Sequence, residues 1–229
     1  MGTVLNPLII RARSLARKTG IIRVINRFRR TGPYEQKVHK ALTDAIKSGD
    51  VVWDIGANIG VYSELFCEIV GKDGLVVAFE PLPDSCEQIL ARIPNCSWLH
   101  IENIALGDED RPGRLVTQKN SYENHIQAEG QDPADSIPVQ ICRGDTVLQR
   151  LRRVPNVVKV DVEGFEEEVI QGMQNMLESL ALRSVLIEVH FLKLEMRGRA
   201  TAPSRIEKLL DSRGYRTTWV DASHLFATR

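Results

Sequence analysis

The stretch WDIGANIG, residues 53–60, follows two valines and leads directly into the apolar run VYSELFCEIVG. The valines and Trp53 predict a short buried β-strand, and the apolar run predicts a helix. Asp54 therefore ends a buried strand, where an uncompensated charge is costly. Gly56 and Gly60 permit a tight turn and a close approach of the backbone to a ligand. The stretch predicts a binding turn, and whatever compensates Asp54 indicates the ligand.

Alternating strand and helix patterns extend outward from this turn. Strands are predicted at residues 51–56, 74–81, 96–106, 156–164 and 184–190, and helices at 34–50, 61–70, 83–92, 165–180 and 203–213. The runs 214–221 and 224–229 are close enough to form a terminal hairpin. Residues 113–118 and 137–142 predict two further strands that flank a polar loop. The alternation predicts an α/β fold with a parallel sheet and crossover helices.

The composition is that of one soluble globular domain. Of the 229 residues, 43% are hydrophobic and 26% are charged, and no break in composition divides the chain. The formal net charge is zero, so we expect no nucleic-acid partner. No apolar run approaches the roughly 18 residues of a membrane span. The chain has four cysteines, Cys67, Cys86, Cys96 and Cys142, and they form no CxxC pair. This spacing favours free thiols in a reducing, cytoplasmic compartment.

Residues 1–33 form a basic, amphipathic, helical N-terminal segment. Eight arginine and lysine residues precede the first acidic residue, Glu35. The segment has three interpretations: a helix packed on or tethered to the domain, a helix lying on an anionic membrane surface, or an organellar presequence. We place the packed helix first and peripheral membrane contact second. Residues 34–229 then form the main domain.

The spacing of the glycine turn separates two classes of ligand. A dinucleotide fingerprint has the form G-x-G-x-x-G, in which the second glycine admits the pyrophosphate. Here that position is Asn58, and Asp54 precedes the first glycine by two residues. A carboxylate repels a pyrophosphate but attracts the α-ammonium of a methionine moiety, which favours S-adenosylmethionine. The alternatives are a nicotinamide-dependent oxidoreductase and a nucleoside-cofactor-binding scaffold without turnover.

Glu80 is a second indication of a nucleoside ligand. It ends the next strand, 26 residues after Asp54, where an acid can accept hydrogen bonds from both hydroxyls of a ribose. Either acid alone could be a strand-end cap. At the ends of consecutive strands, the two acids together favour nucleoside binding.

Four motifs in this order resemble the FkbM-type family of S-adenosylmethionine-dependent methyltransferases: DIGANIG, AFEPLPDS, NIALGD and VKVDVEGFEEEVIQG. The resemblance covers roughly residues 34–229, and DVEG after a strand is its most distinctive part. It implies a Rossmann-like class I methyltransferase fold. In that fold a seven-stranded sheet has the order 3-2-1-4-5-7-6, strand 7 is antiparallel, and helices cover both faces. It also implies S-adenosylmethionine as the cofactor.

Carried over by position, the resemblance assigns cofactor contacts. The residues that it places at the methionine part are Asp54, Gly56, Ala57, Asn58 and Gly60. It places Glu80 at the ribose, with Pro81 beside it, and Ala105 and Leu106 near the adenine. Residues 119–136 match no pattern, and we expect this loop to influence the choice of methyl acceptor.

The acceptor chemistry is predicted at the ends of the fourth and fifth strands. Related methyltransferases with nitrogen acceptors often carry an Asp/Asn-Pro-Pro-aromatic loop where this chain has DVEG, which favours an oxygen acceptor. Asp161 and Glu163 leave the fourth strand, Glu188 and His190 leave the fifth, and all four could converge on the emerging methyl group. A hydroxyl acceptor benefits from a base, for which Asp161 is our first candidate. His190 is either the base or a core polar group, and Glu163 either joins the site or caps the following helix.

The remaining features have simpler interpretations. The same acids and histidine could hold Mg²⁺, but the resemblance requires no metal and we expect none. We interpret residues 166–168, EEE, as one solvated helix turn. The predicted function is O-methylation of a sugar, a glycolipid or a polyketide-like metabolite.

Overall fold

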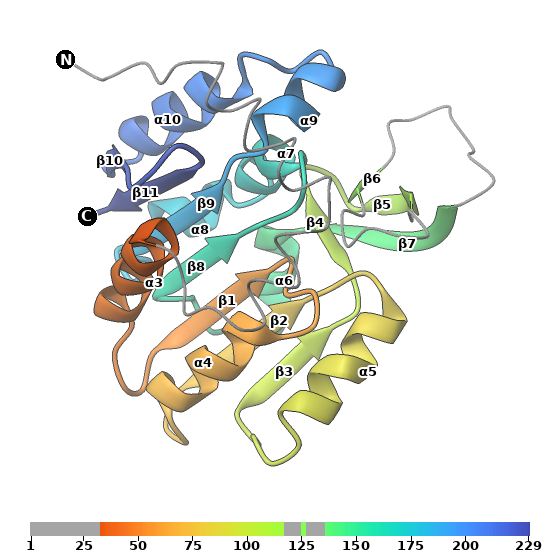
Figure 1. The fold of residues 1–229 in the computed structure, drawn as a ribbon, viewed down its shortest axis with the longest axis vertical. Helices are drawn as coiled ribbons and strands as arrows, with labels where there is room; N and C mark the ends of the chain where they lie inside the picture. Colours follow the sequence, from red (N-terminus) through yellow and green to blue (C-terminus); the bar gives the residue numbers. More distant parts are fainter. Residues whose placement is uncertain (1–32, 117–124, 127–135) are drawn as a thin grey trace.

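The computed structural model describes residues 33–116, 125–126 and 136–229, and a seven-stranded sheet runs through its centre (Figure 1). Its strand order is β10-β11-β9-β8-β1-β2-β3. β11 runs antiparallel to both of its neighbours, β10 and β9, and the other pairs of this sheet are parallel. The predicted order 3-2-1-4-5-7-6, with strand 7 antiparallel, is therefore confirmed. The strands are β1 (Val51–Ile55), β2 (Leu75–Phe79), β3 (Leu99–Glu102), β8 (Val157–Val160), β9 (Ser184–Glu188), β10 (Arg216–Trp219) and β11 (His224–Thr228).

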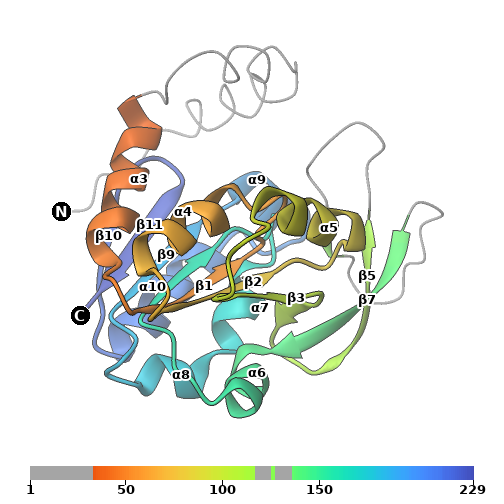
Figure 2. The same cartoon turned by 90° about the horizontal axis from the view of Figure 1, so that it is seen from below.

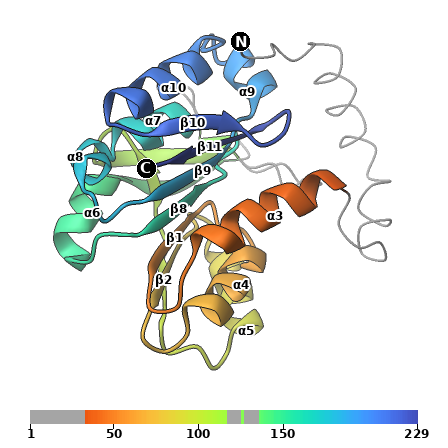
Figure 3. The same ribbon diagram turned by 90° about the vertical axis from the view of Figure 1, so that its left-hand side faces the viewer.

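Helices cover both faces of this sheet (Figures 2 and 3). One face carries α3 (Pro33–Ala45), α4 (Val61–Val70) and α5 (Pro83–Arg92). The other carries α6 (Gly144–Leu151), α7 (Glu166–Gln171), α8 (Gln174–Glu178) and α10 (Ala202–Ser212). The short helix α9 (Phe191–Met196) follows β9.

The alternation of side chains along the buried strands decides which face each residue serves. Val51, Trp53 and Ile55 of β1 join the core beneath α7 and α10, whereas Val52 joins the core beneath α3 and α4. Asp54 shares the parity of Val52 and therefore faces α4. In β8, Lys159 faces the same side by the same rule. The sheet thus directs two charged side chains from neighbouring strands into one layer.

A second, four-stranded sheet was not predicted. Its order is β4-β7-β5-β6, and it is built from β4 (Ala105–Gly107), β5 (Arg111–Val116), β6 (His125–Ile126) and β7 (Ser136–Arg143). The two predicted strands of this region exist as the antiparallel pair β5 and β7. The predicted strand at 96–106 is divided into β3 and β4, which belong to different sheets. Most of the loop at 119–136 lies outside the described residues.

The single helix predicted over residues 165–180 is divided into α7 and α8. The break falls at Gly172, where an added Cβ would lie 1.9 Å from the carbonyl oxygen of Gly107 in β4. The chain therefore passes the second sheet at a distance that only glycine permits. Apolar periodicity continues through the break, which is why the pattern predicted one helix.

The N-terminal segment of residues 1–33 falls almost entirely outside the described residues, so its predicted helices and membrane contact stay predictions. Within the part of the chain that the structure describes, no helix has the length and apolar character needed to cross a membrane.

Candidate active site

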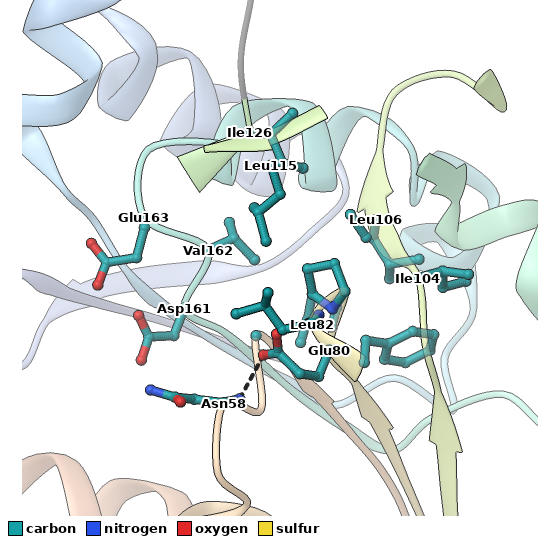
Figure 4. A pocket seen from close by; sticks show the side chains of 15 residues that line it. Asn58, Glu80, Leu82, Ile104, Leu106, Leu115, Ile126, Asp161, Val162 and Glu163 are labelled. Atoms are coloured by element: carbon teal, nitrogen blue, oxygen red, sulfur yellow. Dashed lines mark hydrogen bonds between the residues drawn. The ribbon is translucent and has the colours of Figure 1, made fainter. Parts of the chain in front are cut away.

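An open cleft lies at the carboxyl ends of β1, β2 and β8 (Figure 4). Such edges of parallel sheets are where α/β proteins bind ligands. One wall is charged and the other is apolar. The residues that line the cleft are Ile55, Gly56, Asn58, Phe79, Glu80, Pro81, Leu82, Ile104, Ala105, Leu106, Leu115, Ile126, Asp161, Val162 and Glu163.

The turn after β1 forms the floor of the cleft. Gly56 has a φ of 80°, and a Cβ at this position would lie 1.9 Å from the carbonyl oxygen of Asp161. Asn58 also has a positive φ, of 52°. The N–H groups of Gly56 and Ala57 both donate to the carbonyl of Phe79 at 3.0 Å, which ties the turn to β2. Gly60 does not line the cleft but lies against Ile89 of α5.

Glu80 lies where the sequence predicts, at the end of β2 and in the cleft. Its side chain is buried, and its two carboxylate oxygens accept hydrogen bonds from the backbone N–H groups of Asn58 at 2.8 Å and Leu82 at 2.9 Å. Burial raises the pKa of Glu80 to about 7, although these two donors oppose the shift. Each oxygen keeps a further lone pair, so the carboxylate can still accept hydrogen bonds from a ligand.

Asp54 is placed differently from the prediction. It is fully buried, does not line the cleft, and accepts a hydrogen bond on Oδ2 from Ser63 at 2.7 Å. Lys159 Nζ lies 3.5 Å from its other oxygen, Oδ1. The inference that a ligand must compensate Asp54 is therefore wrong, because a lysine of the chain does so. A direct contact between Asp54 and a cofactor stays a prediction.

The segment after β8 forms the charged wall. Asp161 and Glu163 point to the same side in Figure 4, and atoms of both approach His190 Nε2, at 3.7 Å and 3.0 Å respectively. Lys193 Nζ lies 2.9 Å from Glu163 Oε2. Its φ of 56° is rare for a residue other than glycine. Burial raises the pKa of Glu163, while His190 and Lys193 act to lower it.

Glu166 holds His190 from the other side. His190 Nδ1 lies 2.7 Å from Glu166 Oε1, and the same oxygen accepts a hydrogen bond from the N–H of Gly164 at 2.8 Å. Burial alone would lower the pKa of His190, but Glu166, Glu163 and Asp161 outweigh burial and raise it to about 10. These carboxylates favour the imidazolium form of His190 at neutral pH. The role of His190 as the base stays a prediction.

The interpretation of residues 166–168 as a solvated turn is wrong, since all three glutamates are buried. Glu167 pairs with Arg205 at 2.5 Å and Glu168 with Arg197 at 2.5 Å. Arg197 also donates to the carbonyl of Gly164. Arginines from the distant segment 197–205 thus hold the loop that carries Glu163.

Glu188 does not join the cluster of Asp161, Glu163 and His190. It lies opposite His224 in the pairing of β9 with β11, and its Oε2 is 3.5 Å from His224 Nε2. The difference arises because β9 ends at Glu188, so His190 lies beyond the strand and no longer follows its alternation. Glu188 is not among the described residues that line the cleft.

The apolar wall comes from two parts of the chain. Ala105 and Leu106 line it, together with Pro81, which follows β2, and their contact with the adenine stays a prediction. Leu115 and Ile126 reach it from the second sheet and lie near Val162 in Figure 4. The sequence alone did not predict that Leu115 and Ile126 reach the cleft. Their position depends on the pairing of β5 with β6, which are separated by a loop.

Ligand atoms of Asp161, Glu163 and His190 lie within 4.8 Å of one another and could surround a metal ion. The cluster already contains two cationic partners, since Lys193 and the His190 imidazolium both contact Glu163. Its carboxylates therefore have compensating charges within the protein. The prediction that no metal is required stays a prediction.

Comparison with known proteins agrees with the motif analysis. Residues 54–217, more than half of the chain, match the profile of the methyltransferase FkbM domain. The chain belongs to the FkbM methyltransferase family.

Two curated relatives of this FkbM-family chain are methyltransferases. Hexuronic acid methyltransferase AglP of Haloferax volcanii is 31% identical over 162 residues, which are 68% of this chain and 62% of that relative. Methyltransferase sdnD of Sordaria araneosa is 27% identical over 208 residues, or 76% of each chain. The FkbM-family chain thus spans less than two thirds of the AglP sequence.

Solved structures confirm the fold. An rRNA methylase from Streptococcus thermophilus has a TM-score of 0.52 at 9% identity, covering 87% of this FkbM-family chain and 96% of that one. A Streptococcus mutans protein in complex with S-adenosylhomocysteine (SAH) has a TM-score of 0.53 at 10% identity, covering 87% and 97%.

Proposed function

We propose that this FkbM-family chain transfers a methyl group from S-adenosylmethionine to a hydroxyl group of a sugar. The observation that carries the proposal is the continuity of the cleft. It joins Glu80 and the apolar residues Ala105 and Leu106 to the carboxylates of Asp161 and Glu163. Residues that could hold a nucleoside and carboxylates that could accept a proton therefore line one open space.

The residues present fit the cofactor. Glu80 can accept hydrogen bonds from ribose hydroxyls, since its side chain is buried at a strand end with free lone pairs. Pro81, Ala105 and Leu106 offer apolar surface for the adenine.

When bound, S-adenosylmethionine supplies an electrophilic methyl group on sulfur; transfer to an oxygen leaves SAH and one proton. The chain's contribution is to align the acceptor and to take that proton. Asp161 is the base in this proposal. It lines the cleft, it is partly exposed, and Lys159 donates to its Oδ2 at 3.3 Å, which leaves Oδ1 toward His190. Glu163 is less available, because His190 and Lys193 both hold its Oε2.

A sugar is the favoured acceptor because AglP, whose name is hexuronic acid methyltransferase, is 31% identical to the matched residues. The test is tritium transfer from S-adenosyl-[methyl-³H]methionine to a panel of acceptors. The panel contains methyl hexuronosides, neutral methyl hexosides and a total glycolipid extract. Incorporation into any sugar-containing fraction supports the proposal, and no incorporation into any member of the panel contradicts it.

Asp161→Asn tests the base. We expect it to lower the single-turnover rate by roughly 10²–10⁴-fold, the range for acid–base groups, and to leave SAH affinity nearly unchanged. Asp73→Asn, an exposed aspartate between α4 and β2, is the matched control. An Asp161→Asn variant with the wild-type rate would contradict the assignment of Asp161 as the base. Loss of the rate in EDTA, with recovery in Mg²⁺, would instead make the carboxylates a metal site.

A further inference from the structure

Lys159 is a buried charge in the middle of the sheet. It belongs to β8, which lies between β1 and β9, and its side chain is only 7% exposed. Its neighbours in the strand are valines that join the two cores. A buried ammonium group is costly unless it is paired, so its partners indicate why this position is a lysine.

Those partners come from three adjacent strands and one helix. Asp54 of β1 lies 3.5 Å from Lys159 Nζ, and Asp161, which follows β8, lies 3.3 Å from it. Glu188 of β9 adds a third negative charge that acts on the ammonium. The ring of Tyr62 of α4 has its centroid 4.9 Å from Nζ. One ammonium thus lies beside the carboxylates of Asp54 and Asp161, at the ends of β1 and β8.

The two nearest carboxylates belong to different halves of the site. Asp54 precedes the turn that forms the cleft floor, and Asp161 opens the charged wall. The two halves also touch through the backbone, since Asp161 N–H donates to Ile55 O at 2.9 Å. The Lys159 side chain links the two halves, because its Nζ lies within 3.5 Å of both carboxylates.

We infer that Lys159 is a positioning residue of the methyl-transfer site, whose ammonium holds the Asp161 carboxylate against the cofactor turn. This inference rests on the proposed function. Without the ammonium, Asp161 is free to turn toward His190 or solvent, since its side chain is 27% exposed. Asp54, which is fully buried, has no such alternative position. The loss of Lys159 therefore misplaces the acceptor side of the site.

The competing explanation is that Lys159 only neutralises buried acids and so contributes to folding. A double-mutant cycle separates the two roles. Lys159→Met, Asp161→Asn and the double variant are compared for single-turnover methyl transfer to the sugar panel and for the unfolding midpoint. Arg183→Met is the control. It removes an ion pair with Asp50, at 2.6 Å, and both residues directly precede strands, so the pair lies at the end of the sheet away from the cleft.

We expect Lys159→Met to lower the turnover rate by roughly 10²-fold, the loss that a misplaced group can cause, with little change in KM for S-adenosylmethionine. In the Asp161→Asn background the same change should have little further effect. Lys159→Arg, which keeps the charge, should recover most of the rate. Arg183→Met should lower the unfolding midpoint and leave the rate unchanged.

Equal losses from Lys159→Met in both backgrounds, or a folded variant with the wild-type rate, would overturn the inference. If Lys159→Met does not fold, Lys159→Gln replaces it in the cycle, because its amide keeps a hydrogen-bond donor without the charge. A wild-type protein that methylates no member of the panel contradicts the proposed function itself, whereas an additive cycle in an active enzyme contradicts only the role of Lys159.

Discussion

At the scale of single residues, the ionisation of Glu80 links pH to cofactor affinity. Its pKa in the free protein is raised to about 7 by burial. A ribose hydroxyl donates best to the carboxylate, so binding below this pKa must first release a proton. We expect SAH affinity to rise with pH up to about 7, by at most tenfold per unit, and then to level off. Calorimetry between pH 5.5 and 8.5, in buffers of different ionisation enthalpy, would also count the released proton.

Glu80→Gln is the direct control, since it keeps the shape of the side chain and cannot titrate. Its affinity should be lower and nearly independent of pH, whereas Asp84→Asn on the exposed start of α5 should behave as the wild type. The same pKa has a consequence for stability. Between 4.5 and about 7 the unfolded glutamate has lost its proton and the folded one has kept it, so the contribution of Glu80 to stability falls as pH rises. Wild-type affinity that is flat or falls with pH would contradict this role of Glu80.

At the scale of elements, the contact between the turn after β1 and the end of β8 depends on Gly56. Alanine at this position meets both a positive φ and a carbonyl oxygen 1.9 Å from its Cβ. Gly49 has a similar φ of 84° but open space around its Cβ. We expect Gly49→Ala to cost roughly 1–2 kcal/mol of unfolding free energy for the left-handed backbone alone. Gly56→Ala should cost about 1–3 kcal/mol more, because of overpacking.

Urea unfolding of the two variants, with SAH affinity measured alongside, checks this expectation. Only Gly56→Ala should weaken SAH binding, since the turn must move away from Asp161. Equal losses of stability at both positions, with affinity retained, would mean that the close approach is not required.

The strands and helices also differ in how well the sequence predicts them. VVWDI and LVVAF are short apolar runs bounded by turns, so β1 and β2 lie within the predicted ranges. The residues of β5 and β7 find their partners across a long loop, and that pairing leaves no local pattern from which the second sheet could be predicted. The division of α7 from α8 depends on the contact of Gly172 with Gly107, which is equally non-local.

At the scale of the whole molecule, the motifs predicted many of the residues that line the cleft, whereas tertiary contacts determine how their charges are paired. DIGANIG, the acid after β2 and DVEG all reach one cleft, as parallel topology requires. Lys159 and Glu166 were missed for different reasons. A lysine inside VVKV is a signal of a buried partner, since lysine is rarely buried unpaired. Glu166 stands between similar glutamates, and only the position of His190 distinguishes it.

The most direct measurement is calorimetric titration of the full chain with SAH and, separately, with NAD, repeated on Glu80→Ala. A cleft built for S-adenosylmethionine predicts saturable binding of SAH at one site and no saturable binding of NAD. It also predicts a loss of roughly 1.5–3 kcal/mol of binding free energy in the variant, the value of a hydrogen bond to a charged group. Saturable NAD binding with no binding of SAH would contradict the assignment of the cleft.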